Sequence, residues 1–346
     1  MVVGLHASIT FPLTASWMHQ VAELGNMGVQ LFFLVSAVTM CHMWRQRHNE
    51  TARTTKFYIR RFFRIAPLFW CAIIFYTFLW HLTPDRRGLS GIGLQDIVLT
   101  ALFLHPFAVS AINSVVPGGW SIGIEMGFYG VFPLLARLRG IRVLLAAFVL
   151  YLTLGLAGTA FCERFGSGDD YSTFLYYSFL TQLPIFPIGM FVYSLASRDS
   201  EARFSPALAI IALWLVVAFV GKYAIHITAR PFFWCEVFML AMLVDVSIRW
   251  DLQSRALAFF GQLSYSIYLF HFAVLYLFEK TVGSRWPYWV GLPTALAVTA
   301  LLAMVSRNTA EKWSQDAGRL LIGALQNRLS AKQDPQAQPR TPRPST

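Results

Sequence analysis

The chain of 346 residues is 56% hydrophobic and carries 13% charged residues, about half of the roughly 25% found in soluble domains. This deficit excludes an ordinary soluble fold and predicts an all-α polytopic membrane protein. The net charge of +11 does not indicate nucleic-acid binding, because the basic residues lie in short loops between apolar runs rather than on one continuous face.

A basic loop at residues 45–64 sets the expected topology. It holds seven Lys and Arg, and short loops of this kind stay on the cytoplasmic side of a membrane. Alternation from this loop places 21 of the 28 basic residues and both chain termini inside. We expect about ten spanning helices, in the segments 1–15, Gly28–Trp44, Ile65–Leu82, Trp120–Ala136, Val143–Phe161, Thr173–Ala196, Ala207–Gly221, Pro231–Ile248, Leu257–Phe278 and Tyr288–Val305.

Three segments depart from this regular pattern. Residues 1–15 are shorter than the roughly 20 that a spanning helix needs, so we expect the second half of a helix, with Met1 as a start placed too far downstream. Residues 16–27 are polar and are interpreted as an outer loop. The apolar run 97–107 has only 11 residues and is interpreted as re-entrant or interfacial. The membrane domain then covers 1–329, and the Pro-rich tail 330–346 is predicted to be disordered and cytoplasmic.

Two ionisable residues lie inside apolar runs, where such residues are functional candidates by default. His6 lies in the first run, and Glu125 lies one turn into the span that follows Gly118-Gly119. Structural alternatives stay open: a neutral histidine satisfied by a neighbouring helix, and an acid that seals a contact between helices. The four cysteines are scattered without CxxC spacing, so neither a metal site nor a disulfide framework is expected.

Two further groups of polar residues follow helical spacing. Arg60 and Arg64 share one helix face beside Arg61, and guanidinium groups match phosphate with two parallel hydrogen bonds. Ordinary anchoring of a cytoplasmic loop is the alternative. Ser264, Tyr268 and His271 form a polar stripe on one face, which suits either a substrate path or contacts between helices.

These segments together resemble the acyltransferase-3 family of integral membrane acyltransferases. The resemblance runs in order along nearly the whole chain, through Val3–Ala7 (VGLHA), Gly28–Ser36 (GVQLFFLVS), Phe57–Pro67 with its three arginines, Trp120–Pro133 (WSIGIEMGFYGVFP), Leu263–His271 (LSYSIYLFH) and Glu311.

The resemblance implies transfer of an acyl group, usually acetyl from acetyl-CoA, to a hydroxyl of a glycan on the far side of the membrane. It makes His6 and Glu125 the expected catalytic residues, with His6 as base or acyl relay. It assigns the CoA donor to Arg60, Arg61 and Arg64, and needs no metal. We assign substrate binding to Trp120, Ser121, Tyr129, Ser264, Tyr268 and His271.

Four positions depart from the family pattern. An arginine usually lies one helix length before the histidine, and here the chain starts too late to contain it. Gln30 stands where many members have Asp, Ala37 where many have Gly, and Lys312 where Pro is usual. The last three indicate a sub-branch, and Gln30 is similar to members associated with exopolysaccharides.

The expected protein is therefore an O-acetyltransferase of a bacterial inner membrane, with lipid and a surface or exported polysaccharide or lipopolysaccharide as partners and with no nucleic acid. A transporter or flippase that moves a glycan or acylated substrate without chemistry is the alternative. A structural partner of an export complex is a third reading, which the insertion cost of several polar motifs disfavours.

Overall fold

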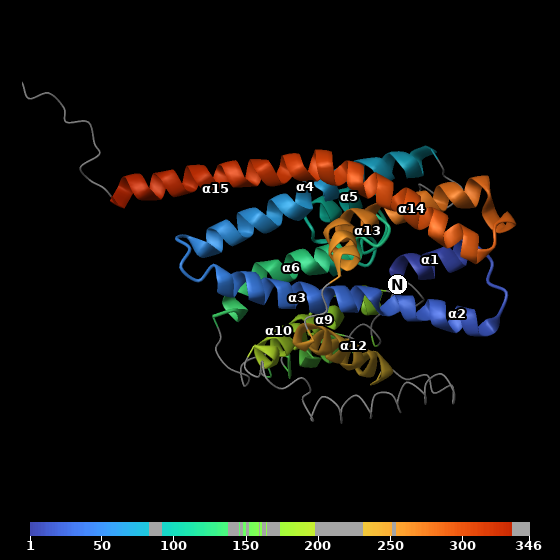
Figure 1. Ribbon diagram of the computed structural model, residues 1–346, viewed down its shortest axis with the longest axis horizontal. Coiled ribbons are helices and arrows are strands. Elements are labelled where there is room, and N and C mark those ends of the chain that lie inside the picture. The colour runs from blue at the N-terminus through green and yellow to red at the C-terminus, as the bar shows by residue number, and fades with distance from the viewer. Residues whose placement is uncertain are drawn as a thin grey trace, which may run out of the picture.

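In the computed structural model, the described residues are 1–82, 92–137, 174–197, 231–250 and 254–333, with short stretches between 145 and 164, and every regular element among them is helical (Figure 1). Four described helices are long and apolar enough to cross a membrane: Ser16–Gln46, Arg53–Leu82, Arg255–Thr281 and Tyr288–Ala331. The expected span 207–221 lies outside the described residues, and 143–161 is described only in part. The number of ten spans and the sidedness of the termini stay predictions.

The N-terminal region is more helical than expected. Helix α1 (Val2–Thr10) is followed by α2 (Ser16–Glu23), the short η1 (Leu24–Met27) and α3 (Gly28–Gln46). Interpreting residues 16–27 as a loop was wrong, because the segment is polar but contains no proline and is rich in good helix formers. Figure 1 shows α2 and α3 as one continuous line, with α1 folded back beside it.

Small residues let α1 lie close to its neighbours. A Cβ atom added to Gly25 would come within 2.7 Å of Leu5 Cβ, and one added to Gly291 of α14 (Tyr288–Ser306) would come within 2.4 Å of the Phe11 ring. The Tyr288 hydroxyl also donates a hydrogen bond to Gly4 O at 3.0 Å. These contacts fix α1, and with it His6, against the C-terminal helices.

Helix α4 (Arg53–Leu82) begins twelve residues before the expected third span and carries the arginine motif on its first turns. Pro67 has no N–H, so the carbonyl of Phe63 lacks its usual helical donor. Ser314 of α15 (Lys312–Gln333) donates its hydroxyl proton to that carbonyl. Figure 1 shows α15, a helix that the sequence did not suggest, running beside α4. A π-helical turn, η6 (Arg307–Glu311), joins α14 to α15.

The segment interpreted as re-entrant or interfacial forms two short helices, α5 (Leu94–Ala101) and η4 (His105–Phe107), ahead of α6 (Trp120–Leu135). The buried His105 Nε2 donates to Gly119 O at 2.9 Å, which ties this segment to the turn that opens α6. The described remainder comprises α9 (Phe179–Gln182), α10 (Ile185–Ala196), α12 (Pro231–Arg249), α13 (Arg255–Thr281) and η5 (Gly283–Arg285).

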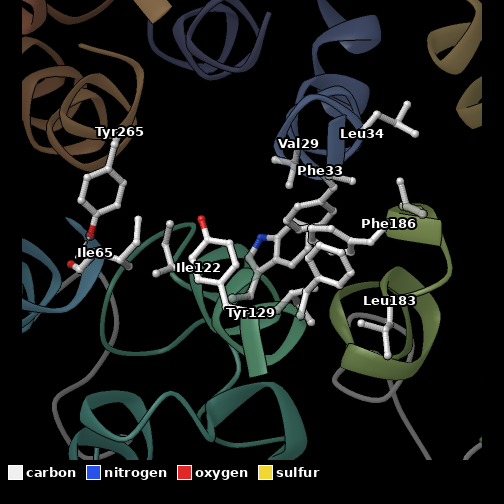
Figure 2. Close-up of a cluster of buried hydrophobic side chains, with 14 of the residues drawn as sticks. Val29, Phe33, Leu34, Ile65, Ile122, Tyr129, Leu183, Phe186 and Tyr265 are labelled. Carbon is white, nitrogen blue, oxygen red and sulfur yellow. Dashed lines mark hydrogen bonds between the residues drawn. The ribbon is translucent and has the colours of Figure 1, made fainter. Parts of the chain in front are cut away.

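The main apolar core lies between α3, α6 and α10. Figure 2 shows Phe33 and Phe186 facing one another, with Tyr129 and Ile122 of α6 directed into the same cluster. A Cβ atom at Gly189 would come within 2.7 Å of Leu34 O, so this glycine sets the close approach of α10 to α3. The rigid core holds α3 and α6 in fixed register, and both helices carry site residues.

Candidate functional site

A cavity of about 450 Å³ opens beside α1, and we call it the histidine cavity. His6 lines it from α1, and one face of α13 lines it with Tyr268, Phe272 and Glu279. Aromatic side chains from other elements complete the wall: Trp80, Trp120, Tyr176 and Tyr177. The two tryptophans and two tyrosines offer flat apolar faces together with N–H and O–H groups.

His6 is paired with His271 across 265 residues of sequence. His6 Nδ1 lies 3.0 Å from His271 Nε2, and the two rings stack with centroids 5.2 Å apart. His271 is 0% exposed and lies behind His6 rather than in the cavity wall. Its Nδ1 lies 2.7 Å from Tyr268 O and 3.2 Å from Ile267 O.

A second polar group lies beside Tyr268, which lines the cavity together with Gly118. Ser121 Oγ donates to the Tyr268 hydroxyl at 2.9 Å, and that hydroxyl donates to Gly118 O at 2.9 Å. Gly118 has φ +73°, and a Cβ atom there would come within 2.8 Å of the Tyr268 hydroxyl oxygen. The structure therefore brings together five of the expected residues: His6, Trp120, Ser121, Tyr268 and His271.

Glu125 does not reach His6. Its Oε1 accepts hydrogen bonds from Ser36 Oγ at 2.7 Å and from the Tyr129 hydroxyl at 2.5 Å. Its Oε2 is buried and has no hydrogen-bond partner within the described part of the chain. The structure therefore does not bring the two expected catalytic residues into contact, and His6 is paired with His271 instead. We call Ser36, Glu125 and Tyr129 the carboxylate layer.

The arginine motif forms a separate, smaller pocket of about 60 Å³, the arginine pocket. Arg60 is held by Glu50 through two hydrogen bonds of 2.9 and 2.7 Å, and Arg61 is buried. In the described ranges no carboxylate forms an ion pair with the other arginines of the pocket. Its lining is Met43, Trp44, Arg47, Arg53, Phe57, Arg60, Arg61 and Arg64.

The charge of this pocket is only partly balanced. The hydrogen bonds from Arg60 hold the pKa of Glu50 below its ordinary value. Burial, followed by repulsion from Arg60, lowers the pKa of Arg47. Arg53 stacks on Trp44 with its guanidinium carbon 3.7 Å from the ring centroid. Crowded guanidinium groups of this kind are a site for an anion, because an anion would relieve their mutual repulsion.

The histidine cavity and the arginine pocket lie at opposite ends of α3 and α4. On α3, Val29 lines the histidine cavity and Met43 lines the arginine pocket, which puts them about 21 Å apart at 1.5 Å per residue. The carboxylate layer lies between the two cavities, as the course of α6 indicates. This helix begins at Trp120, which lines the histidine cavity. Further along it reaches Tyr129, and the guanidinium carbon of Arg61 lies 5.1 Å from the centroid of the Tyr129 ring.

Ser264 is not brought to either cavity. Its hydroxyl donates to Gly261 O in its own helix at 2.8 Å, while Ser266 on another face of α13 hydrogen-bonds Glu311. Within the described ranges, no group of three or more His, Cys, Asp and Glu residues is placed to hold a metal ion.

Sequence reasoning missed the aromatic wall and several partners. Tyr176 and Tyr177 lie in an apolar segment, and no motif or spacing in the sequence marks them as site residues. Arg47 and Arg53, which the sequence placed only in the basic loop 45–64, line the arginine pocket. Gln30, noted only as a departure, is fully buried and donates to Gln182 Oε1 at 3.1 Å and to the Tyr176 hydroxyl at 3.4 Å. Its polarity inside an apolar run was the available signal.

Comparison with known proteins gives a consistent set of relatives. A family described as "Acyltransferase domain" matches residues 1–307. Acyltransferase MdmB of Streptomyces mycarofaciens is 26% identical over 83% of this chain and 77% of its own length, and BcsY of Komagataeibacter xylinus is 25% identical over 87% and 79%. Peptidoglycan O-acetyltransferase OatA of Listeria monocytogenes is 24% identical over 87% of this chain, which spans about half (52%) of OatA. No solved structure matches the chain.

Proposed function

The chain belongs to the acyltransferase-3 family of membrane acyltransferases, and from that premise we propose that it transfers acetyl from cytoplasmic acetyl-CoA to a hydroxyl of a surface or exported polysaccharide or lipopolysaccharide. The observation that carries the proposal is the pair of cavities at opposite ends of α3 and α4. One is lined by arginines and the other by a histidine and aromatic rings. The name of OatA supports O-acetyl transfer as the chemistry.

The arginine pocket is the proposed donor site. CoA carries about four negative charges on its phosphates, and Arg47, Arg61 and Arg64 offer charge-assisted hydrogen bonds to them. A pocket of about 60 Å³ accommodates a phosphate group rather than the whole donor. The remainder of CoA then lies outside the pocket, and its acyl end extends toward the carboxylate layer.

The histidine cavity is the proposed acceptor site. A sugar hydroxyl beside His6 loses its proton to the imidazole as its oxygen forms a bond with the acyl carbon. The thioester C–S bond breaks, and the CoA thiolate leaves and takes up the proton that the imidazolium releases. Such a base contributes about 10²–10⁴-fold to the rate. A second role for His6 is that of acyl relay, in which the imidazole attacks the thioester and expels the CoA thiolate, and then passes the acyl group to the sugar hydroxyl.

Four apolar helices in the described ranges agree with a membrane protein. We assign it to the inner membrane of a bacterium, with the arginine pocket facing the cytoplasm because short basic loops stay inside. Lipid surrounds the helices, and the glycan approaches from the other side.

The test is acetyl transfer from radiolabelled acetyl-CoA to endogenous glycan in membranes that contain this chain. We expect His6→Ala to lower the rate about 10²–10⁴-fold, the contribution of a general base. His19→Ala removes an exposed imidazole of α2 and should leave the rate unchanged. Label that reaches glycan equally in wild type and His6→Ala would contradict the assignment of His6. Absence of label in correctly inserted wild type, with movement of unmodified glycan in vesicles, would favour the flippase instead.

A further inference from the structure

The pairing of His6 with the buried His271 determines which ring nitrogens carry protons. His6 is exposed to the histidine cavity, whereas His271 is fully buried and contacts His6 from behind. Phe272 packs on both rings, with centroids 4.4 Å from His6 and 4.1 Å from His271. In the described part of the chain, no carboxylate lies within ion-pair distance of either ring.

The backbone around His271 determines its protonation. The carbonyl oxygens of Tyr268 and Ile267 can only accept hydrogen bonds, so the Nδ1 atom that faces them carries a proton. A neutral imidazole has one N–H, which leaves His271 Nε2 with its lone pair. A doubly protonated His271 would place an unpaired charge in a fully buried site, which is strongly unfavourable.

The proton on His6 follows from that of His271. His271 Nε2 can only accept, and His6 Nδ1 lies 3.0 Å from it, so His6 Nδ1 carries the proton and donates. His6 Nε2 then keeps its lone pair. The bond made by one ring nitrogen sets the state of the other, as a carboxylate does for the histidine of a serine-hydrolase triad.

We infer that His271 is a positioning residue that fixes His6 in the tautomer protonated on Nδ1 and leaves Nε2 as the atom that takes the acceptor proton or carries the acyl group. The chemical consequence rests on the proposed function, whereas the tautomer does not. His271 contacts neither substrate in this arrangement, so it acts through His6, in place of the substrate contact expected from the sequence.

Two substitutions separate the two bonds that His271 makes. In His271→Gln the side-chain amide reaches the place of Nε2, where its oxygen accepts from His6 Nδ1. In His271→Asn the shorter amide reaches only the place of Nδ1, so the bond to Tyr268 O survives and the bond to His6 is lost. We expect His271→Gln to keep kcat within about threefold and His271→Asn to lower it at least tenfold, with KM for the acceptor changed less than threefold in both. Equal loss of kcat in both variants would overturn the positioning role.

The ¹⁵N spectrum of the full chain in lipid, with labelled histidine, reads the tautomer directly. His6 is assigned by the signals that disappear in His6→Gln. We expect a protonated, pyrrole-type Nδ1 and an unprotonated, pyridine-type Nε2 for His6, and loss of this pattern in His271→Asn. A His6 signal with its proton on Nε2 would overturn the inference even if both variants were inactive. If no form of the chain transfers acetyl, the proposed function fails and the spectrum still decides the tautomer.

Discussion

The arginine pocket and the histidine cavity differ in how the chain builds them. Every residue that lines the arginine pocket comes from one continuous stretch, residues 43–64, in which the end of α3 turns back into α4. The histidine cavity unites His6, Gly118, Tyr176 and Tyr268, which are far apart in the sequence. The first is a local structure whose positive charge is only partly balanced by Glu50, whereas the second depends on the packing of α1 and α6 against α13. The two should therefore respond to different perturbations.

Neutralising the arginine pocket should have the largest effect on donor binding. Hydrogen bonds to charged groups contribute about 1.5–3 kcal/mol, so Arg64→Gln should raise KM for acetyl-CoA roughly 10–100-fold. The wild-type KM should rise with ionic strength, and the variant should respond less because one screened contact is gone. Arg319→Gln removes an exposed arginine of α15 outside the pocket and serves as the control. An unchanged KM in Arg64→Gln would contradict the assignment of the donor site.

A substitution at the turn that precedes α6 should disturb the histidine cavity and leave the arginine pocket intact. Gly118→Ala places a Cβ atom at φ +73° and 2.8 Å from the Tyr268 hydroxyl oxygen, and we expect a loss of stability of about 1–3 kcal/mol. Gly130→Ala, in α6 with open space at its Cβ position, is the matched control and should be neutral or stabilising. Thermal unfolding in detergent measures both. Acetyl-CoA binding should survive Gly118→Ala, and equal unfolding temperatures for the two variants would contradict the close packing of this turn.

Removing Glu50, which binds Arg60 of the arginine pocket, should have the smallest effect on donor binding, in the opposite direction. Glu50→Gln releases Arg60 from its two hydrogen bonds, so KM for acetyl-CoA should fall by about two- to fivefold, because an ion pair of this kind contributes roughly 0–1 kcal/mol.

The sign of the pH dependence follows from the lowered pKa of Glu50. The ion pair stabilises the loop fully above the ordinary value of 4.5 and is lost as the pH falls through the lowered pKa. The difference in the free energy of unfolding between wild type and Glu50→Gln should therefore be constant near neutral pH and should shrink as the solution becomes acidic. A difference that grows as the pH falls below 4.5 would contradict this sign.

The helical class and the arginine motif could be predicted from the sequence, because each depends on composition or on neighbouring residues. The pairing of His6 with His271 and the isolation of Glu125 from His6 could not, because helical spacing says which residues share a face but not which faces meet. α15 was missed for a related reason: its polar sequence gives no membrane signal, and its partner is the carbonyl freed by Pro67.

Equilibrium binding of radiolabelled acetyl-CoA to the purified chain tests most directly whether the two cavities serve two substrates. We predict that His6→Ala binds acetyl-CoA with wild-type affinity although its transfer rate is lost, and that Arg64→Gln binds it roughly 10–100-fold more weakly. Weakened binding in His6→Ala, or unchanged binding in Arg64→Gln, would contradict the separation of donor and acceptor sites.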